Sequence, residues 1–391
     1  MKVAVIGASG LVGGRLYDRL KNMEGVSAKA LVHSSGHVWN LARTLEPLTF
    51  VDLLDPDTLK QALDGCSHVV NCSRGNPQVM LEGLDNIIAC SREAGIRRLI
   101  HLSSSTVYGR DHDVAELTED APARPAPGYG RLKWDQDEKV IEAGRKGMET
   151  IILCPPNITG HASKFMEEMW SALCTGQLGF VDGGRRPFSA VDVDNLCEAI
   201  VRSLQVKMVR RSRYFINDGV APSWAELVNK LEHLSGRTFD TVPVDEEWLR
   251  LVTKKVQPRT SVFKSLKHMV SSDVREALRG DPLLARADKG VRGLVAKLPA
   301  GVENQLRRSI EGTIRVSKAD LHPPVDIGLT SRQLVQFSYS IENARRDLGY
   351  EPVLNWAESA QSFMQWRQEY DERLAGYEDL FEDLAPGSAF A

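Results

Sequence analysis

Short apolar runs alternate with amphipathic stretches along the first half of the chain. The β-branched run Lys2–Ile6 predicts a strand, and apolar residues at helical spacing follow it from Leu11 to Leu20. Further strands are predicted over 28–33, 68–72, 98–103 and 149–153, and further helices over 56–63, 78–94 and 129–145. This alternation is typical of a doubly wound parallel sheet with helices on both faces, so the sequence predicts the α/β class.

The alternation becomes less regular after Pro155. Apolar segments near 188–190 and 214–216 can return to the sheet, whereas the region beyond Arg237 is more helical in pattern, as are 163–174 and 223–234. We therefore expect two domains: a first domain over 1–160, with its sheet completed by about 188–217, and a smaller, mostly helical substrate-binding lobe over 161–187 and 218–391.

A basic segment interrupts the second lobe at about 250–321. Residues 250–320 hold 16 Lys and Arg against 7 Asp and Glu, in a chain whose formal net charge is −3. Apolar residues at helical spacing, such as Phe263, Leu266 and Val270, predict basic amphipathic helices. The simplest interpretation is a solvated cap whose apolar stripe packs on the domain. A lid over an anionic substrate and a contact with an acidic membrane surface are the alternatives.

The composition narrows the class of protein. Of 391 residues, 42% are hydrophobic and 26% charged, which excludes disordered and fibrous proteins. No apolar run is long enough to cross a bilayer, and the chain begins with a predicted strand where a signal peptide would need a charged and then apolar leader, so we expect a cytoplasmic protein without a nucleic-acid partner. The six cysteines and nine histidines show no metal-ligand spacing, so buried, reduced cysteines and no metal site are expected.

A glycine-rich turn joins the first predicted strand to the first predicted helix. Gly7 permits a tight turn, Gly10 lets the backbone approach a pyrophosphate, and Gly13 lets helix and strand pack closely. The N-terminus of the helix then faces the anion. The turn therefore predicts a Rossmann-like domain that binds a dinucleotide.

Two motifs follow this turn. The first is His101-Leu102-Ser103-Ser104-Ser105-Thr106-Val107-Tyr108-Gly109, and the second is Tyr129-Gly130-Arg131-Leu132-Lys133. Together with the glycine turn they resemble the extended short-chain dehydrogenase/reductase superfamily, in its NAD-dependent epimerase/dehydratase family. The resemblance covers nearly the whole chain except the basic segment, and it implies a catalytic triad of Ser104, Tyr129 and Lys133.

The chemistry of this triad can be argued from the residues themselves. A phenol holds its proton up to about pH 10, so Tyr129 can act as an acid/base near neutrality only if its anion is stabilised. Lys133 follows one helical turn later, so its ammonium can reach the same face and lower the pKa of Tyr129. Ser104, at the carboxyl end of a predicted strand, can hydrogen-bond the substrate oxygen. Ser103 or Ser105 would take that role if the register of the motif differs by one.

The choice of nicotinamide cofactor depends on the end of the second strand. An Asp or Glu there usually accepts from the ribose hydroxyls of NAD, but His33 and Ser34 stand at this position. With Arg43 they suit a 2′-phosphate better, so NADP is slightly favoured over NAD. The expected cofactor-binding residues are Gly7, Ser9, Gly10, Leu11, Val12, Gly13, His33, Ser34, Asp52, Leu53, Cys72, Ser73, Tyr129, Lys133 and Pro155.

The resemblance leaves two substrate classes open. Asn157 and Arg186 match positions at which nucleotide-sugar enzymes hold a diphosphate, and an arginine fork suits phosphate oxygens. Ser105 and Thr106 are expected to line the same substrate site. They also stand where sugar 4,6-dehydratases need an Asp-Glu pair, which argues against elimination chemistry. The segment 176–183 resembles instead the reductase and hydroxysteroid dehydrogenase branch.

Three functional hypotheses follow. The leading one is an NAD(P)-dependent oxidoreductase or epimerase that transfers a hydride at a secondary alcohol or ketone of a nucleotide sugar. The second is an NADPH-dependent ketone reductase or alcohol dehydrogenase on an apolar substrate. The third is a dinucleotide sensor without turnover. The tyrosine and lysine at this spacing argue against it, because a sensor does not need them. Because the family often dimerises through two helices of its nucleotide domain, a homodimer is plausible.

Overall fold

The computed structural model describes residues 1–33, 41, 48–256 and 324–384. Among these, the described residues of 1–251 and 325–384 form one compact unit. The helices predicted from the basic segment, and its expected membrane or substrate contacts, fall almost entirely outside the described residues.

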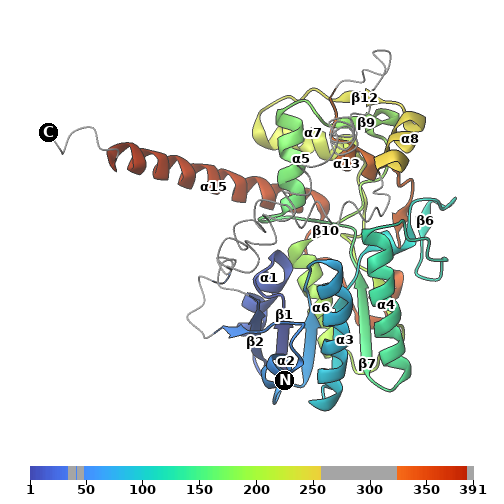
Figure 1. Ribbon diagram of the computed structural model, residues 1–391. Coiled ribbons are helices and arrows are strands. Elements are labelled where there is room, and N and C mark those ends of the chain that lie inside the picture. The colour runs from blue at the N-terminus through green and yellow to red at the C-terminus, as the bar shows by residue number, and fades with distance from the viewer. Residues whose placement is uncertain (34–40, 42–47, 257–323, 385–391) are drawn as a thin grey trace, which may run out of the picture. The chain divides into compact units, whose positions relative to one another are not determined.

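A seven-stranded parallel sheet forms the centre of the unit (Figure 1). Its strands, in spatial order, are β11 (Arg213–Phe215), β7 (Glu149–Cys154), β5 (Arg98–Leu102), β4 (His68–Asn71), β1 (Lys2–Ile6), β2 (Ser27–Val32) and β3 (Thr49–Phe50). The strand order reverses at β1, whose neighbours are β2 and β4. In such sheets a ligand binds beyond the carboxyl ends of the strands at this reversal, so the fold itself positions a site there.

Helices cover both faces of the sheet. On one face lie α1 (Leu11–Lys21), α6 (Val193–Gln205) and α14 (Glu342–Leu348), and on the other lie α2 (Pro56–Leu63), α3 (Pro77–Glu93) and α4 (Tyr129–Arg145). The alternation within β1 explains both layers, because Val3 and Val5 join the first core and Ala4 and Ile6 join the second. The predicted Rossmann-like, doubly wound α/β fold is confirmed.

The structure differs from the sequence prediction at the sheet's second edge. The segment near 214–216 does join the sheet, as β11. The segment near 188–190 does not, because β10 (Ala190–Asp192) pairs with β8 (Asn157–Thr159) in a separate two-stranded ladder. Pro155 and Pro156 lie between β7 and β8, and since proline has no N–H to donate, they end the main ladder before β8 begins. The short edge strand β3 was not predicted.

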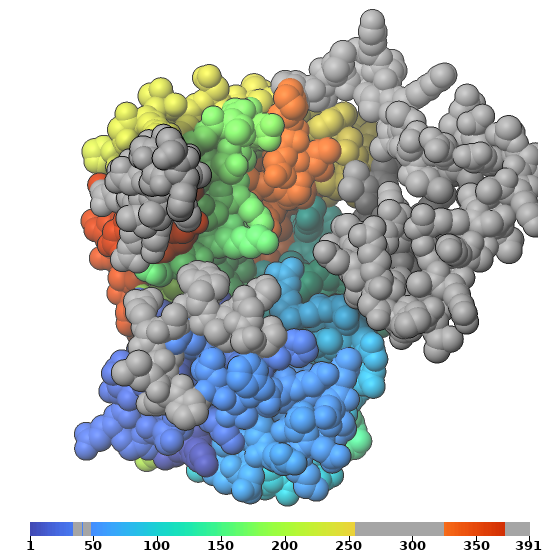
Figure 2. Space-filling view, turned by 60° about the vertical axis from the view of Figure 1, so that its left-hand side comes forward, coloured from blue at the N-terminus to red at the C-terminus, as the bar shows by residue number. Residues whose placement is uncertain are grey.

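The second half of the chain builds a mostly helical lobe, as expected. Its elements are α5 (Lys164–Cys174), α7 (Trp224–Ser235), α8 (Glu246–Val256), α13 (Ile327–Thr330) and α15 (Trp356–Leu384), with strands β9 (Gly179–Val181) and β12 (Val242–Val244), while β6 (Glu116–Leu117) pairs with β13 (Ser338–Tyr339). Segments far apart in the sequence, coloured green, yellow and orange, form one continuous surface (Figure 2). Aromatic rings contribute to the core of this lobe: Phe165 is stacked on Phe188, and Trp224 meets both rings edge-on. The proposed domain boundary at residue 160 stays a prediction.

The cysteines depart from expectation at one position. All six are free thiols, and most are buried or half-buried, but Cys174 ends α5 and is exposed. Among the described residues, no cluster of His, Cys, Asp or Glu could hold a metal ion. The described helices include none that is both long and apolar enough to span a membrane.

Candidate active site

The glycine turn follows β1 and leads directly into α1. Gly7 has a φ of +79°, which glycine adopts without strain, and a Cβ there would lie 2.9 Å from the carbonyl carbon of Cys72. A Cβ on Gly13 would overlap the carbonyl oxygen of Gly7. Gly10 occupies the N-cap, so no capping side chain competes for the N–H groups of the first helical turn. The turn is a close-fitting backbone cradle at the positive end of a helix, which fits the pyrophosphate of a dinucleotide.

The remaining predicted cofactor residues gather at the carboxyl ends of the parallel strands. Ser9, Leu11 and Val12 belong to the glycine turn, His33 follows β2, Asp52 and Leu53 follow β3, Cys72 and Ser73 follow β4, and Pro155 follows β7. Ser34 and Arg43 lie outside the described residues. Because these ends meet along one edge of the sheet, the structure brings the set together. The contact of each with a dinucleotide stays a prediction.

Local interactions fix several of these residues. The Ser73 N–H and Oγ both donate to Asn71 Oδ1, at 3.0 and 2.6 Å. Asp52 Oδ1 accepts the N–H of Leu54 at 2.9 Å, whereas Leu53 is buried in the core. Burial raises the pKa of the Cys72 thiol to about 12, so this thiol stays protonated at neutral pH.

The three predicted catalytic residues lie where β5 and α4 meet. Ser104 follows β5 and its Oγ accepts the N–H of Thr106 (3.3 Å). Tyr129 is the first residue of α4, with 40% of its surface exposed. Lys133, one turn later, is buried and its Nζ donates to the carbonyl oxygen of Leu102 (2.8 Å), the last residue of β5. Gly130 allows α4 to approach the short helix after Ser104 closely, since a Cβ there would lie 2.9 Å from the carbonyl oxygen of Thr106.

Buried charges continue along α4 behind Lys133. Burial lowers the pKa of Lys133 to about 8, although the negative charge of Asp137, one turn further on, opposes this. Burial likewise raises the pKa of Asp137 to about 6, against the opposing charge of Arg213. Arg213 Nε donates to Asp137 Oδ2 at 3.0 Å and its guanidinium lies over the ring of Trp134. The sequence analysis did not select Asp137, although its spacing from Lys133 matches that of Lys133 from Tyr129.

A second unpredicted residue, Arg74, stands over the tyrosine. Its guanidinium carbon lies 5.2 Å from the centroid of the Tyr129 ring. Burial raises the pKa of Tyr129, the charge of Arg74 lowers it, and that of Asp137 raises it. Arg74 follows Cys72 and Ser73 in the loop after β4, so its place shortly after a strand was the available signal in the sequence.

The predicted substrate residues lie on the lobe side of the sheet edge that carries Ser104 and Tyr129. They differ in their burial and in their polar partners. Asn157 begins β8, where its Nδ2 donates to the carbonyl oxygen of Ser189 (3.0 Å). Arg186 is 14% exposed and forms an ion pair with Glu246 through Nη2, while its Nη1 is buried without a hydrogen-bond partner among the described residues. Ser105 is buried and Thr106 exposed, both in the short helix after Ser104.

Arg332 was missed by the sequence analysis. Its Nη1 donates to Asn157 Oδ1 at 2.5 Å, and its guanidinium lies 4.7 Å from the ring centroid of Phe165. The residue lies 175 positions after Asn157, beyond the basic segment, in a short 3₁₀ helix. No local motif surrounds it, so sequence patterns gave no reason to place it beside Asn157.

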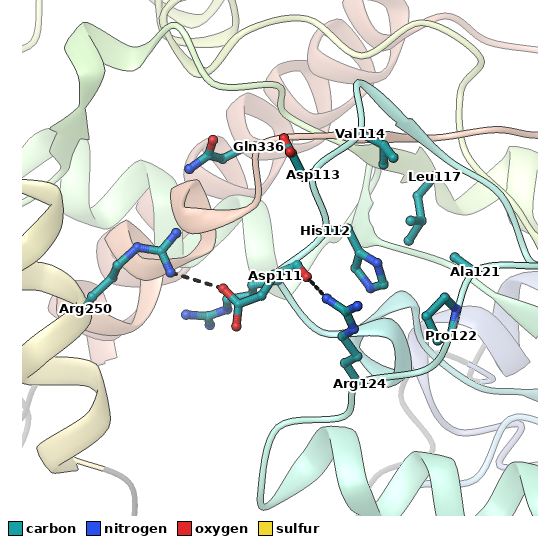
Figure 3. Close-up of a pocket in the computed structure, with 11 residues that line it drawn as sticks. Asp111, His112, Asp113, Val114, Leu117, Ala121, Pro122, Arg124, Arg250 and Gln336 are labelled. Carbon is teal, nitrogen blue, oxygen red and sulfur yellow. Dashed lines mark hydrogen bonds and ion pairs between the residues drawn. The ribbon is translucent and has the colours of Figure 1, made fainter.

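A separate cavity of about 550 Å³ lies beside the loop after Gly109 (Figure 3). Arg250 of α8 and Arg124 both point to Asp111 in this cavity, the first through an ion pair and the second through a hydrogen bond to its carbonyl oxygen. The lining includes none of the predicted site residues. The cavity is therefore distinct from the edge of the sheet that carries the glycine turn, Ser104, Tyr129 and Lys133, here called the catalytic edge.

Comparison with known proteins agrees with this geometry. The model of the NAD-dependent epimerase/dehydratase family matches residues 3–216, more than half of the chain. The chain is 27% identical over 235 residues to the 4-hydroxy-2-methyl-3-oxo-4-farnesyl-3,4-dihydroquinoline-1-oxide ketoreductase of Stigmatella aurantiaca, covering 56% of this chain and 69% of that protein. It is 26% identical over 217 residues to the N-acetyl-alpha-D-glucosaminyl-diphospho-ditrans,octacis-undecaprenol 4-epimerase of Escherichia coli O157:H7, covering 52% and 63%.

Solved structures share the fold. The UDP-glucuronic acid 4-epimerase of Bacillus cereus in complex with NAD superimposes with a TM-score of 0.63 at 14% identity, over 94% of this chain and 96% of that one. The expected family resemblance is confirmed by the family match, and NAD(P) dependence agrees with it. The chain belongs to the NAD-dependent epimerase/dehydratase family, whose members are enzymes built on this dinucleotide-binding fold.

Proposed function

We propose that this protein transfers a hydride between NAD(P) and a secondary alcohol or ketone carbon of a small molecule, with Tyr129 as the acid/base. The observation that carries the proposal is the joint position of Ser104, Tyr129 and Lys133 at the end of β5, on the same edge of the sheet as the glycine turn. A tyrosine and a buried lysine one helical turn apart have an evident use only if a proton moves at the phenol.

Each residue then has a defined task. The bound nicotinamide supplies or takes the hydride. Ser104 donates a hydrogen bond to the substrate oxygen, and Tyr129 takes the hydroxyl proton in oxidation or returns it in reduction. Lys133 places a positive charge behind the phenol and favours the phenolate. Because His33 ends β2 without a carboxylate, we propose NADP as the slightly preferred dinucleotide.

For the substrate we propose a nucleotide sugar. Asn157 and Arg332 are joined by a hydrogen bond, and Arg332 has further N–H groups that can donate to a diphosphate. Arg186 is the weaker candidate, because its Nη2 is paired with Glu246 and its Nη1 is buried. The relative from Escherichia coli O157:H7 is named as a 4-epimerase of a sugar joined through a diphosphate to undecaprenol, so its named substrate shares the sugar diphosphate but not the nucleoside.

A ketone reductase on an apolar substrate is the second candidate. It is favoured by the Stigmatella relative, named as a ketoreductase, of which the match covers 69%. Mass spectrometry of nucleotide released from the denatured, freshly purified protein separates the two. Stoichiometric bound dinucleotide favours an epimerase, which must keep its cofactor through oxidation and re-reduction, whereas an empty site that binds NADPH reversibly favours a reductase.

The role of Tyr129 is tested by the substitution Tyr129→Phe. We expect kcat to fall by roughly a hundredfold to ten-thousandfold, because the proton loses its acceptor while the ring and its packing remain. Turnover is measured by nicotinamide absorbance with a panel of apolar ketones, and by chromatographic separation of the epimers with a panel of UDP-sugars, because an epimerase causes no net change in nicotinamide absorbance. Tyr370→Phe, an exposed tyrosine stacked on Trp366, serves as the matched control and should change nothing. Full activity of Tyr129→Phe would refute the proposed mechanism.

A further inference from the structure

Arg74 is held at the active-site edge by the residues on both sides of it. Before it, Ser73 is bound twice to Asn71. After it, Asn76 caps α3, its side chain accepting the N–H of Val79 at 3.0 Å. The backbone of Arg74 is therefore fixed, and its exposed side chain extends to the ring of Tyr129.

The charge of Arg74 is not used by a carboxylate. Most arginines of the described residues are in ion pairs, as Arg15 is with Asp194 and Arg98 with Glu149. Within the same residues, no Asp or Glu comes within 4.0 Å of the Arg74 guanidinium, whose recorded contact is the ring of Tyr129. An exposed cation over an aromatic face gains about 0.5–1 kcal/mol at most, so structural packing alone is a weak reason for this placement.

Lys133 does not take this position. Its Nζ is directed to the carbonyl oxygen of Leu102, on the inner side of α4. The charged groups that act on Tyr129 are Arg74, on the loop after β4, and Asp137, further along its own helix. Arg74 is the cation that lies over the ring.

We propose that Arg74 is a positioning residue for proton transfer: its guanidinium stabilises the phenolate of Tyr129, together with the ammonium of Lys133. The inference rests on the proposed role of Tyr129. A phenol interacts with the cation weakly while it is neutral and strongly once it is ionised, so the contact favours the form that accepts the proton. The largest cause of the raised pKa of Tyr129 is burial, and Arg74 acts against it.

The test is the ionisation of Tyr129 itself. Phenolate absorbance is titrated in Arg74→Gln and Arg74→Lys, each with its Tyr129→Phe double variant subtracted to isolate the one tyrosine. We expect the pKa of Tyr129 to rise by about 1 in Arg74→Gln and by less in Arg74→Lys, which keeps the charge. Arg237→Gln is the matched control, since Arg237 lies over the ring of Trp170, at 5.9 Å, away from the catalytic edge.

The pH profile gives a second readout. In ketone reduction Tyr129 must be protonated, so the pH at which kcat/KM declines should move upward in Arg74→Gln by the same amount as the titrated pKa. An unchanged Tyr129 pKa in Arg74→Gln overturns the inference, and so does an effect confined to dinucleotide affinity, which would assign Arg74 to the cofactor. An active Tyr129→Phe enzyme would instead refute the proposed function, so the two failures are distinguishable.

Discussion

The predicted cofactor side and the predicted substrate side of the catalytic edge differ in the groups that they offer to an anion. The cofactor side, formed by Gly7, Gly10 and Gly13, offers backbone N–H groups and leaves no room for a side chain at Gly7 or Gly13. The substrate side, formed by Asn157, Arg186 and Arg332, offers one amide and two long charged side chains, and all three already have partners. One site depends on shape, the other on charge.

This difference predicts how each side responds to change. A backbone cradle cannot adjust, because an added atom meets main chain on the opposite wall. Charged side chains can move and exchange partners, so losing one donor weakens a site without abolishing it. Substitutions should therefore have large, pH-independent effects on the cofactor side and smaller effects on the substrate side.

The largest effect is expected for Gly13→Ala. Its Cβ would overlap the carbonyl oxygen of Gly7, and overpacking of this kind costs roughly 3 kcal/mol, which corresponds to about a hundredfold in affinity if the turn opens. Both the melting temperature of the protein and its affinity for NADPH, measured by calorimetry, should fall.

Gly10→Ala in the same turn is the control for this prediction. Its Cβ would stand 3.4 Å from the carbonyl oxygen of Gly7, which the turn can accommodate. The melting temperature should hold while dinucleotide affinity falls, because the new methyl group faces the pyrophosphate. Equal losses of stability in the two variants would contradict the view that shape governs this side.

An intermediate effect is expected for Arg332→Met on the substrate side. Loss of one charge-assisted hydrogen-bond donor costs about 1.5 kcal/mol, so the affinity for UDP-glucuronic acid, titrated in the presence of NAD, should weaken about tenfold. Arg186→Met should instead lower the melting temperature by several degrees, because Arg186 is largely buried and its loss removes an ion-pair partner from Glu246. The reverse ranking would make Arg186 the principal anion-binding residue, as its position in the sequence first indicated.

The two sides also differ in how far the sequence predicted them. The glycine turn could be predicted because a strand, three glycines and a helix lie within a dozen consecutive residues, and the Tyr129–Lys133 pair because one helical turn fixes their spacing. Arg332 and Glu246 reach the substrate side from segments separated by the basic segment, and tertiary packing brings them together. The place of Arg74 after a predicted strand was a weak signal, but its contact with Tyr129, the first residue of α4, depends on tertiary structure and could not be predicted.

A pH-dependent effect, at most comparable in size to that of Gly13→Ala, is expected from the buried charges of α4 behind the catalytic residues. Asp137 is fully buried and its pKa is raised to about 6, so the folded state holds its proton more tightly than the unfolded chain does. Its contribution to stability is complete below the ordinary pKa of an aspartate, near 4, and is lost as the pH rises to about 6, a change of up to roughly 3 kcal/mol.

Asp137→Asn should remove this decline, since an amide cannot ionise. Melting curves recorded from pH 4 to pH 7 should show the variant gaining a few degrees relative to the parent protein as the pH rises, with no further change above about pH 7. Gly13→Ala, which alters no titrating group, should run parallel to the parent over the same range. A parallel curve for Asp137→Asn as well would contradict this prediction. It would mean that the positive charge of Arg213 fully offsets the cost of burying the Asp137 carboxylate.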